Sequence, residues 1–163
     1  MYRGLRHLAW LTLVHFVALS QGSQAATPSA DQALKLTPMQ SGVDYDRPTA
    51  EEAPKCKIVA KKINGHVGWI VEGPAGLMLR RFVDTNNDNV VDQWSYFKDG
   101  LEVYRDIDSN YNGKPDQHRW FNTAGARWGV DTNEDGVIDS WKTISAEEVT
   151  AEVVAAIANR DVE

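Results

Sequence analysis

The chain has 163 residues and a formal net charge of −6, with 23 acidic residues against 17 lysines and arginines. This length is enough for one domain, and the acidic balance, without a basic stripe of interleaved aromatic residues, argues against a nucleic-acid partner. Cys56 is the only cysteine, so an internal disulfide bond is excluded.

The first 25 residues have the features of an export signal. Arg3 and Arg6 precede an apolar run over residues 8–19, which is too short to span a bilayer, and Ser23-Gln24-Ala25 is a small-x-small cleavage sequence. We expect cleavage before Ala26 and export to the periplasm, the cell surface or the extracellular medium, with no transmembrane segment in the mature chain. An uncleaved anchor is the alternative.

Residues 26–55 predict a flexible, Pro-rich tether. They contain four of the six prolines among serine, threonine, alanine, glutamine and acidic residues. The segment leaves room for a short helical turn over residues 31–36, but it has too few apolar residues to form a core of its own.

Residues 56–163 predict one β-repeat domain. Lys57–Ile63 and Val67–Val71 are typical of strands, and Asn64-Gly65 between them is typical of a hairpin turn. A unit of about 24 residues then recurs as strand, turn, strand and acidic loop, with apolar residues at period two. We expect a mainly β fold: an antiparallel meander of about seven or eight strands, with hairpin turns along one edge and acidic loops along the other.

The end of the chain predicts a helix over residues 146–160. Ser145 and Glu148 have the spacing of a capping box, and Val149, Val153 and Ile157 form an apolar stripe at helical spacing. We expect this helix to pack on an open face of the sheet.

Three acidic segments of nine residues share one pattern: loop one (84–92), loop two (108–116) and loop three (131–139). Each has an oxygen-bearing side chain at positions one, three, five and nine, and Asn89, Gly113 or Gly136 at position six. A turn at position six brings the main-chain carbonyl of position seven toward the same centre. The predicted ligands are the side chains of Asp84, Asn86, Asp88, Asp92, Asp108, Asn110, Asn112, Asp116, Asp131, Asn133, Asp135 and Asp139, with the carbonyls of Val90, Lys114 and Val137.

This pattern predicts calcium binding. Ca²⁺ takes six to eight oxygen ligands, whereas Mg²⁺ takes fewer from protein and keeps its waters. Asx-turns between strands are the alternative, but they explain the composition better than the recurrence of the same offsets. Loop two has only two carboxylates, so we expect it to bind most weakly.

The loops resemble the D-x-[DN]-x-D-G loops of EF-hands, dockerins and integrin-type FG-GAP repeats. EF-hands have a bidentate glutamate at position twelve and continue into a helix; here position twelve is Ser95, Arg119 or Lys142, and the residues that follow are strand-like. The integrin-type loop, which uses the ninth aspartate between strands, is closer. Tandem loops of this kind are similar to those of secreted bacterial proteins, and the resemblance covers the loops alone.

The aromatic residues leave a second function open. Trp69, Trp94, Trp120, Trp128 and Trp141 are typical of a small sheet core, but exposed members could bind a glycan or a protein partner. Catalytic motifs and metal-site cysteine pairs are absent from the sequence. We therefore expect a secreted, non-catalytic domain with structural Ca²⁺, and as the alternative an envelope or extracellular interaction module.

Overall fold

The structure, a computed structural model, describes residues 28–148. The predicted export signal and most of the predicted C-terminal helix lie outside these residues. Within the described part of the chain, no helix is long and apolar enough to cross a membrane.

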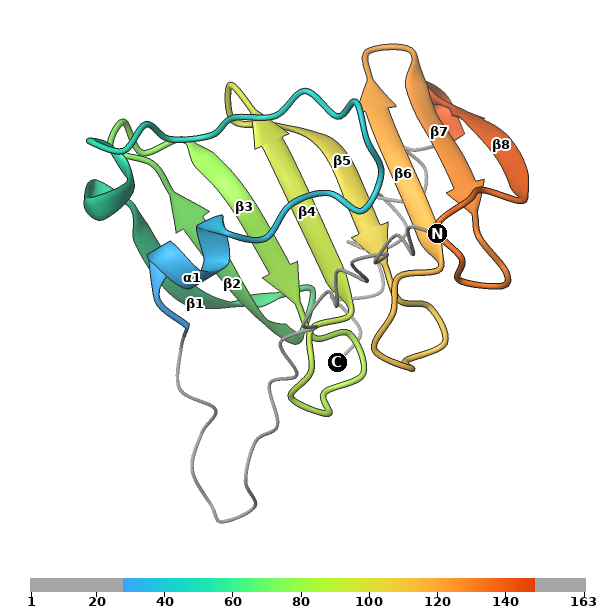
Figure 1. Ribbon diagram of the computed structural model, residues 1–163, viewed down its shortest axis with the longest axis horizontal. Coiled ribbons are helices and arrows are strands. Elements are labelled where there is room, and N and C mark those ends of the chain that lie inside the picture. Colours follow the sequence, from blue (N-terminus) through green and yellow to red (C-terminus); the bar gives the residue numbers. More distant parts are fainter. Residues whose placement is uncertain (1–27, 149–163) are drawn as a thin grey trace, which may run out of the picture.

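One eight-stranded antiparallel sheet forms the body of the protein, with its strands in chain order (Figure 1). Each strand pairs with the next, which confirms the predicted β meander. The unit of strand, turn, strand and acidic loop occurs at β2–β3, β4–β5 and β6–β7, and β8 closes the sheet. The strands are β1 (Lys57–Ile63), β2 (His66–Glu72), β3 (Met78–Val83), β4 (Gln93–Lys98), β5 (Leu101–Ile107), β6 (Gln117–Asn122), β7 (Gly125–Val130) and β8 (Ser140–Ser145).

Short turns and acidic loops lie at opposite edges of the sheet, with one exception. The turns after β2, β4 and β6 lie at the upper edge in Figure 1, and the acidic loops after β3, β5 and β7 lie at the lower edge. The β1–β2 turn lies at the edge of the loops. Its residues Asn64 and Gly65 both have positive φ, 53° and 85°, as the two-residue hairpin predicted from the sequence requires.

Side chains on one face of the sheet form the core. Near β2 and β3, Trp69, Val71 and Phe82 make an apolar cluster. Farther along the same face, Tyr96 and Tyr104 belong to a second cluster, and both of these side chains are completely buried. Alternation along each strand aims these residues at one side, because successive side chains of a strand point to opposite faces.

The N-terminal segment packs on this face, which corrects the prediction of a flexible tether over residues 26–55. Residues 28–55, which we call the N-terminal strap, contain α1 (Ala30–Leu34) and a 3₁₀ turn (Ala53–Lys55), and the strap crosses the front of the sheet in Figure 1. Ala33 and Tyr45 are buried within the two clusters. Composition hid this role because the few apolar side chains of the strap, Ala33 and Tyr45 among them, pack on a core that the sheet provides.

Polar contacts fix the course of the strap. The N–H of Met39 donates to the Asp106 carboxylate at 3.0 Å, and the N–H of Asp46 donates to the Phe97 carbonyl at 2.9 Å. The buried guanidinium of Arg80 donates to the Asp46 carbonyl at 2.9 Å and lies 4.5 Å from the centre of the Tyr45 ring. The strap is therefore part of the domain rather than a linker to it.

The opposite face carries a row of basic and aromatic side chains from strands far apart in the sequence. Glu102 pairs with both Arg81 and Arg105 at 2.7 Å. Burial alone would raise the pKa of Glu102, but the two guanidinium groups outweigh this effect and hold the pKa below its usual value. Farther along, the guanidinium of Arg119 lies 4.4 Å from the centre of a Trp128 ring.

The capping box at the end of β8 is confirmed. The N–H of Glu148 donates to Ser145 Oγ at 3.3 Å, and the N–H of Ser145 donates to the Glu148 carboxylate at 2.8 Å. Residues 146–148 are helical, and the rest of the predicted helix lies outside the described residues.

We predict that Tyr45→Ala lowers the free energy of unfolding by about 3 kcal/mol, because it removes a buried ring from the contact between strap and sheet. Urea unfolding followed by tryptophan fluorescence measures this change. The control is Leu36→Ala, which truncates a side chain of the same segment that is 44% exposed. Equal effects of the two substitutions would contradict an integral strap.

Candidate metal-binding loops

Each acidic loop is a closed turn between two neighbouring strands. The N–H of its ninth residue donates to the carbonyl of the residue just before the loop, at 2.9–3.0 Å in all three loops. These bonds extend the strand pairing by one step and bring the first and ninth positions together. The pairs joined are Asp92 with Val83, Asp116 with Ile107, and Asp139 with Val130.

The first residue of every loop is a buried aspartate. Asp84, Asp108 and Asp131 are each 1% exposed. In loops one and two, both carboxylate oxygens accept main-chain N–H groups, from the fifth and the sixth residue. The distances are 3.2 and 2.8 Å at Asp84, and 3.2 and 2.6 Å at Asp108. These bonds offset the cost of burying a charged group.

Asp131 differs from the other two. Its Oδ2 accepts the N–H of Gly136 at 2.8 Å, but its Oδ1 accepts no hydrogen bond from the residues that the structure describes. A buried acceptor without a partner costs about 1–3 kcal/mol. This oxygen is therefore a place where a cation would restore a missing interaction.

The third and fifth side chains form Asx-turns of the same geometry in all three loops. The third side chain accepts the N–H of the fifth residue, and the fifth side chain accepts the N–H of the seventh. The distances range from 2.7 to 3.1 Å at Asn86, Asp88, Asn110, Asn112, Asn133 and Asp135. A carboxylate or amide oxygen with one such bond keeps a further lone pair for a ligand.

The ninth aspartate of each loop bonds the second residue. In every loop it accepts both the N–H and the hydroxyl of Thr85, Ser109 or Thr132. Asp92 is 1% exposed. Burial raises its pKa, the bonds from Thr85 act in the opposite direction, and the nearby Asp88 raises it further. At the exposed Asp139, the hydroxyl and N–H of Thr132 instead hold the pKa below its usual value.

Two positions in each loop have left-handed backbone. The fourth residues, Asn87, Tyr111 and Glu134, have φ of 62°, 61° and 58°. The sixth residues also have positive φ: 71° at Asn89, 89° at Gly113 and 86° at Gly136. Glycine or asparagine at position six was the turn signal in the sequence; the fourth position was not recognised, and its residue types give no common signal.

The three loops stand side by side along the sheet edge. The N–H of Asp108 donates to the Asp92 carbonyl at 2.8 Å, and the N–H of Asp131 donates to the Asp116 carbonyl at 2.9 Å. The first residue of each later loop is thus bonded to the last residue of the preceding loop.

The structure brings the predicted side chains of each loop into one turn, with their oxygens bonded to main-chain donors. In residues 28–148, no group of three or more histidine, cysteine, aspartate or glutamate side chains has the arrangement of a metal site. Val90 and Val137 at position seven are 43% and 67% exposed, and only their main-chain carbonyls could bind a cation because their side chains are hydrocarbons.

A buried polar cluster lies beside loop two, and sequence reasoning missed it. His118 and Asp106 are each 1% exposed, and His118 Nδ1 lies 2.7 Å from Asp106 Oδ1. The hydroxyl of Tyr104 donates to the same carboxylate oxygen. The carboxylate also accepts the N–H of Met39, so the cluster anchors the strap. Antiparallel pairing of β5 with β6 creates this contact, which no local pattern in the sequence could indicate.

The tryptophans divide between core and surface. Trp69 is buried, Trp94, Trp120 and Trp128 are half-buried, and Trp141 is 48% exposed. The rings of Trp120 and Trp141 lie 5.3 Å apart, centre to centre.

Comparisons with known protein families, curated proteins and solved structures give no match to this chain.

We predict that, without divalent cations, Asp108→Asn lowers the free energy of unfolding by about 2 kcal/mol, because it removes a charged acceptor of two hydrogen bonds. Asp131→Asn should lower the free energy of unfolding by less. The amide oxygen can keep the hydrogen bond from the N–H of Gly136, and the amide N–H₂ then occupies the place of the oxygen that has no partner. Urea unfolding in EDTA compares the two, with Asp44→Asn, an exposed site, as control. A larger cost at Asp131 than at Asp108 would contradict this account of the loops.

Proposed function

We propose that this protein is an exported, non-catalytic calcium-binding domain in which Ca²⁺ held in the acidic loops stabilises the fold. The observation that carries the proposal is the threefold recurrence of one loop geometry. Each copy places the same oxygen-bearing positions around one turn, starting from a fully buried aspartate. Asx-turns alone need neither a buried charge at position one nor an aspartate at position nine.

Electrostatics supports the proposal. Loop one places Asp84 and Asp92 in buried positions with Asp88 nearby, and burial together with Asp88 raises the pKa of Asp92. Carboxylates crowded in this way repel one another, and a divalent cation would convert the repulsion into attraction. The excess negative charge of the chain would then bind the cation in the loops, at one edge of the sheet.

Loop three is the best candidate for an occupied site. It has three carboxylates, a glycine at position six, and the Asp131 oxygen without a partner in the described structure. Loop one has three carboxylates but uses Asn89 at position six. Loop two has two carboxylates, and we expect it to bind Ca²⁺ most weakly.

A non-catalytic role fits the position of the reactive side chains. His118 is 1% exposed and lies beneath the strap. Burial raises the pKa of the Cys56 thiol, which opposes formation of the nucleophilic thiolate. The burial of both groups supports a non-catalytic role.

The alternative is an interaction module that binds a glycan or protein through exposed aromatic residues. The observation that favours it is the pair of rings at Trp120 and Trp141, with the guanidinium of Arg127 4.2 Å from the centre of a Trp141 ring. Paired aromatic rings beside a cation are suited to stacking with a planar or sugar-like ligand. Calcium in the loops would then serve as scaffolding for this surface.

We predict that millimolar Ca²⁺ raises the thermal unfolding midpoint relative to excess EDTA. A single site with a dissociation constant of about 10⁻⁴ M adds roughly 1.4 kcal/mol at about 1 mM Ca²⁺. The combined substitutions Asp131→Ala and Asp139→Ala should remove loop three's share of the increase. Differential scanning calorimetry of the mature chain measures both effects.

The matched control removes two exposed carboxylates outside the loops, Asp31→Ala and Asp44→Ala, and should keep the full calcium response. Calorimetric titration with Ca²⁺ supplies a second measurement that does not depend on thermal stability. An unchanged midpoint together with no detectable heat of binding would overturn the proposal. The interaction module would then become the better account, and Trp141→Ala would be the variant to test.

A further inference from the structure

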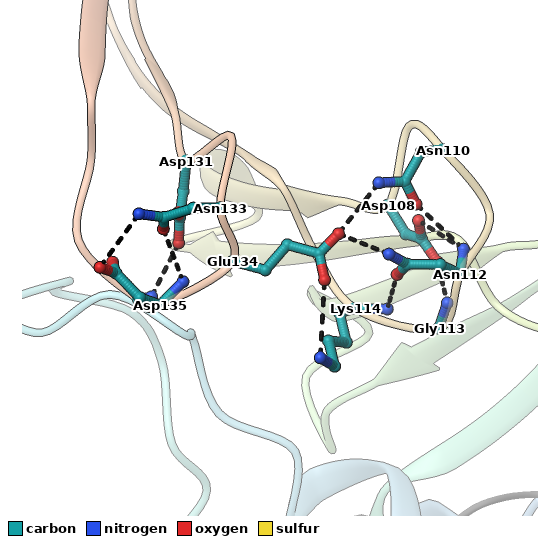
Figure 2. Close-up of polar contacts among 10 residues, drawn as sticks. Asp108, Asn110, Asn112, Gly113, Lys114, Asp131, Asn133, Glu134 and Asp135 are labelled. Atoms are coloured by element: carbon teal, nitrogen blue, oxygen red, sulfur yellow. Dashed lines mark hydrogen bonds and ion pairs between the residues drawn. The ribbon is translucent and has the colours of Figure 1, made fainter.

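Glu134, the fourth residue of loop three, reaches across to loop two (Figure 2). Its Oε1 accepts hydrogen bonds from the side-chain amides of Asn110, at 3.0 Å, and Asn112. Its Oε2 lies 3.6 Å from the ammonium nitrogen of Lys114, and the Glu134 side chain is only 14% exposed. A residue outside the predicted ligand set thus contacts the third, fifth and seventh residues of the neighbouring loop.

The other two loops show what this contact replaces. In loop one, the amide of Asn86 donates to Oδ2 of Asp88 at 2.9 Å, and in loop three the amide of Asn133 donates to Oδ2 of Asp135 at 3.2 Å. The third side chain therefore bonds the second carboxylate oxygen of the fifth residue. Loop two has Asn112 at position five and lacks that oxygen. Glu134 Oε1 accepts the equivalent bond from Asn110 instead.

The Glu134 carboxylate faces two amide donors and one positive charge of loop two: the side-chain amides of Asn110 and Asn112 and the ammonium group of Lys114. Loop two thereby gains a third carboxylate, in addition to Asp108 and Asp116. The charge comes from the neighbouring loop rather than from its own sequence.

We infer that Glu134 completes loop two from loop three, and that calcium binding in loop three therefore orders loop two. The second half of this inference rests on the proposed function. Glu134 has left-handed backbone with φ of 58° and stands between Asn133 and Asp135, two of the candidate ligands of loop three. A cation held by these neighbours would fix the backbone on both sides of Glu134 and so reduce the entropy lost when its side chain bridges to loop two. Coupling of this kind is reciprocal between the two loops.

The test is Glu134→Gln, with amide hydrogen exchange measured by NMR with and without Ca²⁺. The amides to follow are those of Asn112, Gly113 and Lys114, which are bonded within loop two. Glu134→Gln should accelerate their exchange about tenfold, because a charged acceptor becomes a neutral one that also donates. The matched control is Glu51→Gln, the same chemical change at an exposed residue of the strap.

Asn112→Asp gives the sharper version of this test. It gives loop two the position-five carboxylate that loops one and three have, but it also removes the amide that donates to Glu134 Oε1, so that two carboxylates face each other. Adding Glu134→Gln to Asn112→Asp removes this repulsion and should slow loop two exchange, the reverse of its effect in the unmodified chain. This reversal of sign separates the proposed role from a general loosening of the sheet edge.

Calcium separates the two halves of the inference. In the unmodified chain, Ca²⁺ should slow exchange in loop three and, through Glu134, slow it about fivefold in loop two. In Glu134→Gln, loop three should still respond and loop two should not. If Glu134→Gln leaves loop two exchange equal to that of the Glu51→Gln control, the bridge is overturned. If the bridge is present but loop three shows no response to Ca²⁺, the coupling and the proposed function both fail while the structural role of Glu134 stands.

Discussion

The structure depends on one interaction: the buried carboxylate at the start of each acidic loop accepts main-chain N–H groups from that loop. Asp84 and Asp108 each accept two and Asp131 accepts one, and all three loops pass through left-handed backbone at the fourth and sixth positions. The resulting turn returns the chain in register for the next strand. The acidic loops are therefore turns that build the sheet as well as candidate sites for a cation.

Once the loops fix the register, the meander determines the rest of the architecture. Alternation along the strands puts the buried core rings on one face and a row of mixed basic and aromatic side chains on the other, and the N-terminal strap packs on the core face with Ala33 and Tyr45. Hydrogen bonds from Asp108 and Asp131 to the preceding loops align the three loops in a row. This alignment allows Glu134 of loop three to accept hydrogen bonds from loop two.

Local patterns in the sequence predicted the structural elements that form between residues close together in the chain. Period-two apolar spacing indicated the strands, Asn64-Gly65 the first hairpin, and Ser145 with Glu148 the helix cap. The strap, the contact between His118 and Asp106, and the bridge from Glu134 were missed because each joins residues brought together only by strand pairing or by packing on a face. The prolines of the strap predict flexibility, whereas its buried residues decide its position. The calcium ligands themselves stay a prediction.

The most direct test of the central claim is a crystal structure grown in millimolar Ca²⁺, with anomalous diffraction used to locate the ion. We predict a peak in loop three bound by the side chains of Asp131, Asn133 and Asp135, by the carbonyl of Val137 and by Asp139, at about 2.3–2.6 Å. A second peak is expected in loop one. Loops that keep their present hydrogen bonds, with no anomalous peak at any of them, would contradict a calcium-binding function and reduce the acidic loops to turns.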